Sequence, residues 1–279
     1  MNEAQTLLLG TIAGGTIVLG LPLGRLRRPG LNLRQFLNAF AIGILVFLLW
    51  DVLAHAWEPV DRALVDLHSG AADIGPVLGY GGLFLLGTAV GLFSLTYYER
   101  WMDHRASVSV TNNGDARGPA LTGPGTWTAG RRLSLLIAVG IGLHNFGEGL
   151  AIGGSAASGE ISLATVLVIG FGLHNATEGF GIVAPLAAEG DRPSWRFLLM
   201  LGAIGGGPTL FGTAVGGQFN SAAMSVVFLT LAAGSILYVI VQLLAVALRS
   251  DRRELLYWGL FAGLVAGFVT DMVVTAGGA

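Results

Sequence analysis

The chain has 279 residues and a formal net charge of −2; 53% of its residues are hydrophobic and only 11% are charged. Soluble domains carry about 25% charged residues to cover their surface, so this composition excludes a soluble globular protein and predicts several membrane spans. The charge balance leaves no basic excess for nucleic acid, and the lack of cysteine excludes disulfides, thiolate zinc sites and a cysteine nucleophile.

Eight apolar segments are each long enough to cross a bilayer, because a helix needs about 20 residues to span a hydrocarbon core of about 30 Å. They cover residues 5–24, 34–55, 77–98, 133–155, 160–184, 197–217, 222–248 and 255–276. The first is preceded by Glu3 and no positive charge, so we interpret it as a span rather than a cleavable signal peptide. We predict an all-α membrane protein in which residues 1–279 form a single transport domain of eight transmembrane helices.

Arginine supplies every basic residue, and its placement predicts the orientation of the chain. Fourteen of the fifteen arginines fall on one side of the predicted spans, and Arg62 alone falls on the other. The positive-inside rule makes the arginine-rich side cytoplasmic, so an even number of spans places the N- and C-termini outside. The complete absence of lysine indicates GC-rich coding and hence a prokaryotic source.

Two connecting segments differ from the short loops elsewhere. Residues 99–132 form the long linker, whose Gly, Pro and Asn content predicts a flexible cytoplasmic loop. Residues 56–76 form an acidic outer loop that includes Glu58 and Asp61. It is either an ordinary solvated surface or a region that concentrates cations at an entrance.

The pattern H-N-x-x-E-G occurs twice, at residues 144–149 and 174–179, within two adjacent apolar segments. Inserting an ionisable side chain at membrane depth costs roughly 2.5–3.5 kcal/mol, so these residues are not expected to face the lipid. On a helix, the His at the first position lies about 40° from the Glu four residues later, and the Asn lies on the same polar arc. Each hexad therefore presents an imidazole nitrogen, carboxylate oxygens and an amide oxygen to one side.

Antiparallel neighbours joined by a short turn bring the two arcs to similar depths, where they would form one cluster. Two carboxylates balance the charge of one divalent ion, and nitrogen–oxygen ligation without sulfur fits Zn²⁺, Fe²⁺ or Mn²⁺ better than Cu⁺. Two alternatives stay open. The polar pairs could hold helices together, or the His and Glu residues could relay protons, although asparagine does not titrate.

With these paired hexads, the sequence resembles the ZIP (Zrt-, Irt-like protein) family of divalent metal transporters. Members of that family have eight spans, both termini outside, and metal sites built from H-N-x-P-E-G-type motifs on spans four and five. The likeness covers the layout of the whole chain and extends to residues 40–43 in span two and 232–238 in span seven.

The resemblance implies a two-ion site, a homodimer and passage of metal toward the cytoplasm. The metal ligands that it implies are His144, Asn145, Glu148, His174, Asn175 and Glu178. Span two often supplies a further ligand in this family, and the candidate here is Asp51, whose alternative role is that of a helix-end acid near the outer interface. His55, one turn further out, is a candidate entrance ligand.

The sequence departs from the family pattern at several positions. The proline of the motif is replaced by Gly147 and Thr177, so any kink must come from glycine or packing. Span six often carries an acid before a proline, but here the residues before Pro208 are glycines 205–207. The missing acid would remove the second ion or change the charge and selectivity of its site. We interpret the polar residues Gln242 and Asp271 as structural.

We therefore expect a multi-pass transporter of the cell membrane that moves zinc, iron, manganese or cadmium ions into the cytoplasm. The expected partners are the transported ions, the lipid bilayer and a second copy of the chain, with no prosthetic group and no enzymatic activity. The alternatives are a proton or cation channel that uses the same polar pathway, and a membrane scaffold without transport.

Overall fold

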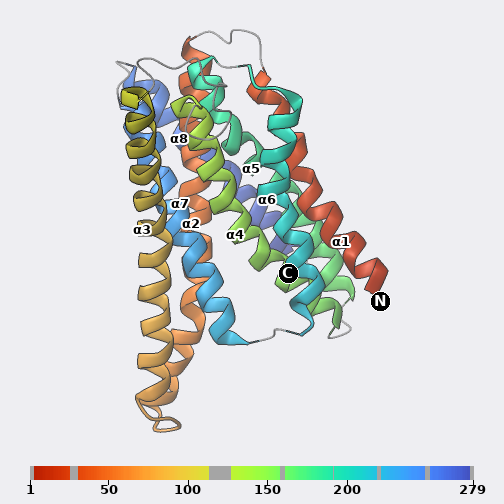
Figure 1. Cartoon of the computed structure of the whole chain (residues 1–279). Helices are drawn as coiled ribbons and strands as arrows, with labels where there is room; N and C mark the ends of the chain where they lie inside the picture. The colour runs from red at the N-terminus through yellow and green to blue at the C-terminus, as the bar shows by residue number, and fades with distance from the viewer. Residues whose placement is uncertain are drawn as a thin grey trace.

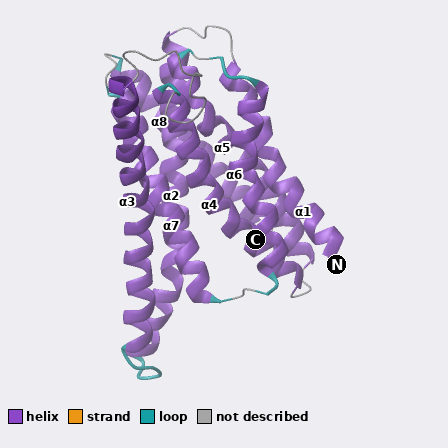
Figure 2. Cartoon of the chain, in the orientation of Figure 1, coloured by secondary structure: helices purple, strands orange, loops and turns teal. Residues whose placement is uncertain are grey.

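The computed structural model describes residues 3–25, 31–112, 127–157, 161–190, 192–218, 221–248 and 252–276. Almost all of these residues are helical, and none of them lies in a strand (Figure 2). The prediction of an all-α protein is confirmed for this part of the chain.

The helices follow one another along the chain as a bundle (Figure 1). The first, α1, runs from Glu3 to Gly15 and continues as two 3₁₀ turns, Thr16–Leu19 and Leu21–Arg25. The others are α2 (Leu31–His68), α3 (Gly75–Asn112), α4 (Ala129–Ala157), α5 (Ile161–Glu189), α6 (Trp195–Gly216), α7 (Ala222–Ala247) and α8 (Arg253–Ala276). Both termini lie toward the same end of the bundle, the end at which α4 finishes and α5 begins (Figure 1).

Seven helical segments within the described residues are long and apolar enough to cross a membrane, and the first of them joins α1 to its 3₁₀ turns. In α5, which occupies the place of the fifth predicted span, the apolar stretch among the described residues is Glu178–Ala187. Large apolar side chains point outward from the bundle, including Leu85 with 71% and Phe211 with 67% of its surface exposed. Such a surface requires lipid around it, so the chain is a multi-pass membrane protein.

Helix α2 is longer than the span predicted from its hydropathy. Its last residue is His68. Gly70 follows two residues later, and its φ of 73° is the left-handed conformation that closes many helices. Residues 56–68, predicted as part of an outer loop, are therefore helical. The lone arginine of that region, Arg62, pairs with Glu58 at 3.0 Å on the exposed surface, and Asp73 accepts the Gly75 amide at the start of α3. At least these two acids thus have local structural partners.

Helix α3 also extends beyond its apolar stretch. It ends at Asn112, before the first glycine of the linker. Since α4 begins at Ala129, the predicted flexible loop over 99–132 is helical at 99–112 and 129–132, and residues 113–126 lie outside the described part. The hydropathy pattern marked where apolar character stops, whereas the helix stops only where a helix-breaking residue appears. Trp57 of α2 packs edge-on against Phe84 of α3 at 5.2 Å between ring centroids, and this hairpin extends beyond the other helices (Figure 1).

Small residues allow close helix contacts in the bundle. On α4, a Cβ added at Gly149 would collide with the Thr209 carbonyl and lie 3.0 Å from Gly212 Cα of α6. Helices α2 and α8 meet in the same way at Gly43 and Gly263. Close backbone approach is the usual means of helix association in lipid, where apolar burial gives no driving force. These contacts hold α4 and α6 together and fix the heights of the polar hexads.

Candidate metal centre

The polar hexads lie in the middle of α4 and α5, and their described side chains are buried. Asn145 and Asn175 are completely buried, and Glu178 has 1% of its surface exposed. His144 and Glu148 are also buried, with 5% and 6% exposed. The backbone of His174 belongs to α5, but its side chain lies outside the described part of the structure.

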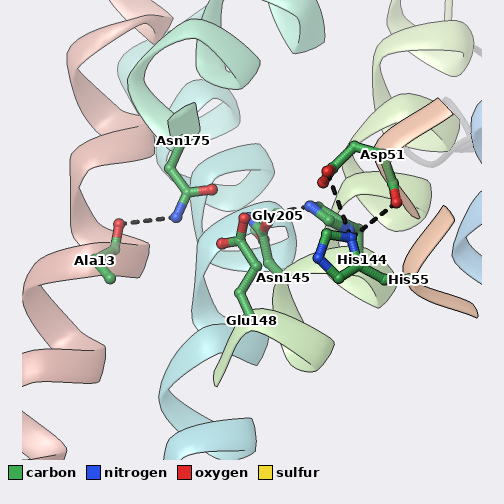
Figure 3. Close-up of polar contacts among 8 residues, drawn as sticks. All are labelled: Ala13, Asp51, His55, His144, Asn145, Glu148, Asn175 and Gly205. Atoms are coloured by element: carbon green, nitrogen blue, oxygen red, sulfur yellow. Dashed lines mark hydrogen bonds and ion pairs between the residues drawn. The ribbon is translucent and has the colours of Figure 1, made fainter. Parts of the chain in front are cut away.

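The two asparagines are anchored by backbone carbonyls of other helices. Asn145 donates through Nδ2 to the Gly205 carbonyl of α6 at 2.9 Å, and Asn175 donates to the Ala13 carbonyl of α1 at 3.0 Å (Figure 3). In each amide the Oδ1 atom is buried and has no hydrogen-bond partner among the described residues. Because the nitrogen and oxygen diverge from the same planar carbon, each anchor turns an oxygen away from the carbonyl that holds the nitrogen.

The Ala13 carbonyl lies where α1 changes its winding. The α-helix ends at Gly15 and a 3₁₀ turn begins at Thr16, whose hydroxyl also donates to the Ala13 carbonyl at 2.7 Å. A change from α to 3₁₀ geometry alters the backbone pairing of the last carbonyls of the α-helix. Asn175 is thereby held by the first span, a partner that the hexad pattern alone does not reveal.

Acidic side chains from both helices approach one another in this buried cluster. His144 Nε2 lies 3.2 Å from Glu148 Oε1 one turn later on α4. The Glu178 carboxylate of α5 interacts electrostatically with His144, Glu148 and the Asn145 amide. Two carboxylates in an apolar bundle repel each other and lose hydration. Such an arrangement is stable only with compensating positive charge, which a divalent cation or protons would supply.

Asp51 of α2 lies on the His144 side of this cluster, close enough for their charges to interact. His55, one turn further along α2, places Nδ1 3.4 Å from Asp51 Oδ1 and 2.9 Å from the Asp51 carbonyl oxygen (Figure 3). The side chain of His55 is 59% exposed and that of Asp51 is 24% exposed. The pair therefore leads from the surface of the bundle toward His144.

Ligand geometry is incomplete in the described side chains. No three of their His, Asp and Glu groups converge closely enough to hold one ion. The complete candidate set also includes the amide oxygens of Asn145 and Asn175, which are not His, Asp or Glu groups. It further includes the side chain of His174, which the structure does not describe.

The span-six position with the missing acid does not face the cluster. A Cβ added at Gly207 would have no atom within 4 Å, whereas Cβ atoms at Gly205 and Gly206 would collide with Ile17 and Gly14. The side of α6 that packs against α1 and α4 therefore presents Gly205, Gly206 and Thr209. Thr209 is completely buried, and no sequence pattern indicates it apart from its place after Pro208.

Gln242 has the structural role that the sequence predicted. Its Nε2 donates to Glu99 Oε2 at 2.9 Å, and Tyr238 donates its hydroxyl to the same oxygen at 2.6 Å. These bonds join α7 to α3 and lie beside a cavity that is also lined by Asn38 and Glu189.

An α-helical, multi-pass membrane protein with a buried His, Asn and Glu cluster between neighbouring helices is the class that these features define. The chain is 30% identical over 277 residues to the zinc transporter ZupT of Escherichia coli strain K12 / DH10B, and the match covers 97% of this chain and 98% of that protein. The zinc transporter ZupT of Escherichia coli O157:H7 matches to the same extent. No family model matches the chain. The chain belongs to the ZIP family, of which ZupT is a member.

Proposed function

We propose that this protein transports divalent transition-metal cations, zinc foremost, across the cell membrane into the cytoplasm. The observation that carries the proposal is the buried cluster of Glu148, Glu178 and His144, in which acids from two helices share an apolar surrounding. The identity of its relative as a zinc transporter supports the same reading.

The chemistry of the donors favours a divalent ion over the other readings of the hexads. The asparagine oxygens are buried and have no hydrogen-bond partner among the described residues, so they can serve as neutral ligands, which a pure proton relay would not use. The full proposed ligand set is His144, Asn145, Glu148, His174, Asn175 and Glu178, with Asp51 as a further ligand at the α2 side. Nitrogen and oxygen donors accept Zn²⁺, Fe²⁺ and Mn²⁺, so iron and manganese are proposed as further substrates.

The membrane arrangement belongs to the same proposal. Eight spans, with α5 as the fifth, would alternate through the bilayer and place both termini on one side, which agrees with their position at one end of the bundle (Figure 1). The opposite end holds the end of the first span at Arg25 and the starts of α4 and α8, which carry Arg131, Arg132 and Arg253. The positive-inside rule makes this end cytoplasmic. We further propose a homodimer in the plasma membrane, on the resemblance to the family alone.

Zinc uptake by proteoliposomes tests the function. The Glu148→Gln and Glu178→Gln variants each remove one charge from the cluster and should abolish uptake, because the remaining ligands no longer balance a divalent ion. Glu254→Gln makes the same change at an exposed position at the start of α8 and should transport at the wild-type rate. Normal uptake by both cluster variants, or proton flux without any metal flux in the wild type, would refute the proposal.

A further inference from the structure

Thr209 is a buried hydroxyl group that lacks the usual local partner. Its side chain has no exposed surface, and Oγ1 has no hydrogen-bond partner among the described residues. Threonines elsewhere in these helices bond the carbonyl four residues earlier: Thr213 bonds the Thr209 carbonyl at 2.8 Å and Thr230 bonds the Val226 carbonyl at 2.6 Å. That local bond is the normal way to satisfy a threonine inside a helix.

The carbonyl that Thr209 could use already accepts another side chain. Four residues earlier on α6 is Gly205, whose oxygen accepts the Asn145 amide at 2.9 Å. A carbonyl can accept two bonds, as the Ala13 carbonyl does, but the Thr209 hydroxyl makes no bond to the Gly205 oxygen. A buried polar atom without a partner is costly, which indicates that this oxygen has a partner in the working protein.

Helix packing places Thr209 at the height of the acids. Helices α4 and α6 run in the same direction, with Asn145 beside Gly205 and Gly149 against the Thr209 carbonyl. A Cβ at Gly205 would lie 3.0 Å from Ile182 Cδ1 of α5.

Because α5 and α6 run in opposite directions, one turn forward from Gly205 on α6 corresponds to one turn back from Ile182 on α5. Those positions are Thr209 and Glu178. Glu148 precedes Gly149 on α4 and shares the same level. A Cβ at Gly14 of α1 would lie 3.0 Å from Thr209 Cβ, so the threonine faces the interior between α1 and α4.

We propose that the Thr209 hydroxyl is a specificity-determining oxygen donor of the α4–α5 ion site, an inference that rests on the proposed function. As a neutral, hard oxygen, it adds a ligand without adding charge. Hard oxygen donors favour Mn²⁺ over softer ions. Thr209 therefore shifts the preference of the site toward Mn²⁺ and away from Cd²⁺.

The test measures binding of Mn²⁺ and Cd²⁺ to the purified full chain by equilibrium dialysis, together with thermal unfolding without metal. Thr209→Val keeps the shape and removes the hydroxyl, and Thr209→Ser keeps the hydroxyl. Loss of one oriented oxygen should weaken Mn²⁺ binding about tenfold and Cd²⁺ binding less, whereas Thr209→Ser should retain the wild-type preference. The unfolding temperature of metal-free Thr209→Val should not fall, because no hydrogen bond is lost.

Two outcomes would overturn the inference. One is unchanged Mn²⁺ affinity and unchanged preference in Thr209→Val. The other is a lower unfolding temperature in metal-free Thr209→Val with no change in ion preference, which would make the hydroxyl structural. If Thr209→Val does not fold, a preference in Thr209→Ala equal to that of the wild type would overturn it equally. Failure of the wild type to bind either ion would instead refute the proposed function.

Discussion

The side-chain amide of Asn175 donates a hydrogen bond to the backbone carbonyl of Ala13 across 3.0 Å, so α1 orients a buried group on α5. The bond directs the Asn175 oxygen away from the Ala13 carbonyl, and that oxygen has no hydrogen-bond partner among the described residues. The first span is thereby part of the candidate ion site, although it contributes only a backbone atom to it.

Replacement of Asn175 by alanine should weaken zinc binding by about 10- to 100-fold, because both the oxygen and its orientation are lost. Equilibrium dialysis of the purified protein measures the change. Asn38→Ala is the matched control: Asn38 is also buried, it donates to the Leu243 carbonyl at 3.4 Å, and its Oδ1 is likewise without a partner. It lies in α2 outside the hexads, so it should bind zinc normally. Equal loss in both variants would contradict the assignment of Asn175.

Acidification should weaken zinc binding. Metal ligation requires a neutral imidazole and ionised carboxylates, so protons compete with the ion at His144 and Glu148. Affinity should therefore fall progressively as the pH is lowered. His144→Gln should bind more weakly at neutral pH and with a shallower dependence on pH, since one competing proton site is gone. Dialysis over a series of pH values gives the slope of zinc affinity against pH for the wild type and for His144→Gln. Identical slopes would exclude His144 as a ligand.

Gly149→Ala should destabilise the protein, because its Cβ would collide with the Thr209 carbonyl and crowd Gly212. Overpacking of this kind costs about 1–3 kcal/mol. On the same helix, a Cβ at Gly147 would meet only Leu229 Cδ2, at an ordinary 3.4 Å, so Gly147→Ala should be tolerated. Thermal unfolding in detergent micelles compares the two variants. Equal unfolding temperatures would mean that α4 and α6 are not in close contact.

Gly207→Glu should leave zinc affinity unchanged. The sequence identified this region as the place of a missing acid, but a side chain at 207 would point away from α1 and α4 into open space. An added carboxylate there cannot reach the cluster. Gly207→Gln, of similar size and without charge, separates any effect of bulk from an effect of charge. Tighter zinc binding by the glutamate variant alone would show that α6 is rotated relative to this structure.

The sequence was sufficient for the class of protein and for the two helices that carry the candidate site. A pair of identical polar patterns in apolar segments is rare enough to identify the region around Glu148 and Glu178. The apolar segments also placed the centre of each helix. The end of α2 could not be predicted from hydropathy, since the helix continues through the polar residues after Trp57 until Gly70 breaks it.

The partners of the hexads could not be predicted because they are distant in the chain and belong to the backbone. Ala13 is 162 residues from Asn175, and Gly205 is 60 residues from Asn145. A carbonyl carries no side-chain signature, so only the packing of α1 and α6 identifies it. Thr209 was missed for the same reason: its lack of a hydrogen-bond partner is visible only in the packed bundle.

The hairpin of α2 and α3 is longer than the membrane is thick. At about 1.5 Å per residue, the 38 residues of α2 extend about 57 Å, more than the about 40–45 Å of a whole bilayer with its headgroups. Part of the hairpin must therefore stand in water. The chain contains no cysteine, so a Ser69→Cys substitution in the exposed turn would supply a single thiol. Its reaction with a membrane-impermeant maleimide in intact cells would report directly which face of the membrane carries that turn and, with it, the two termini.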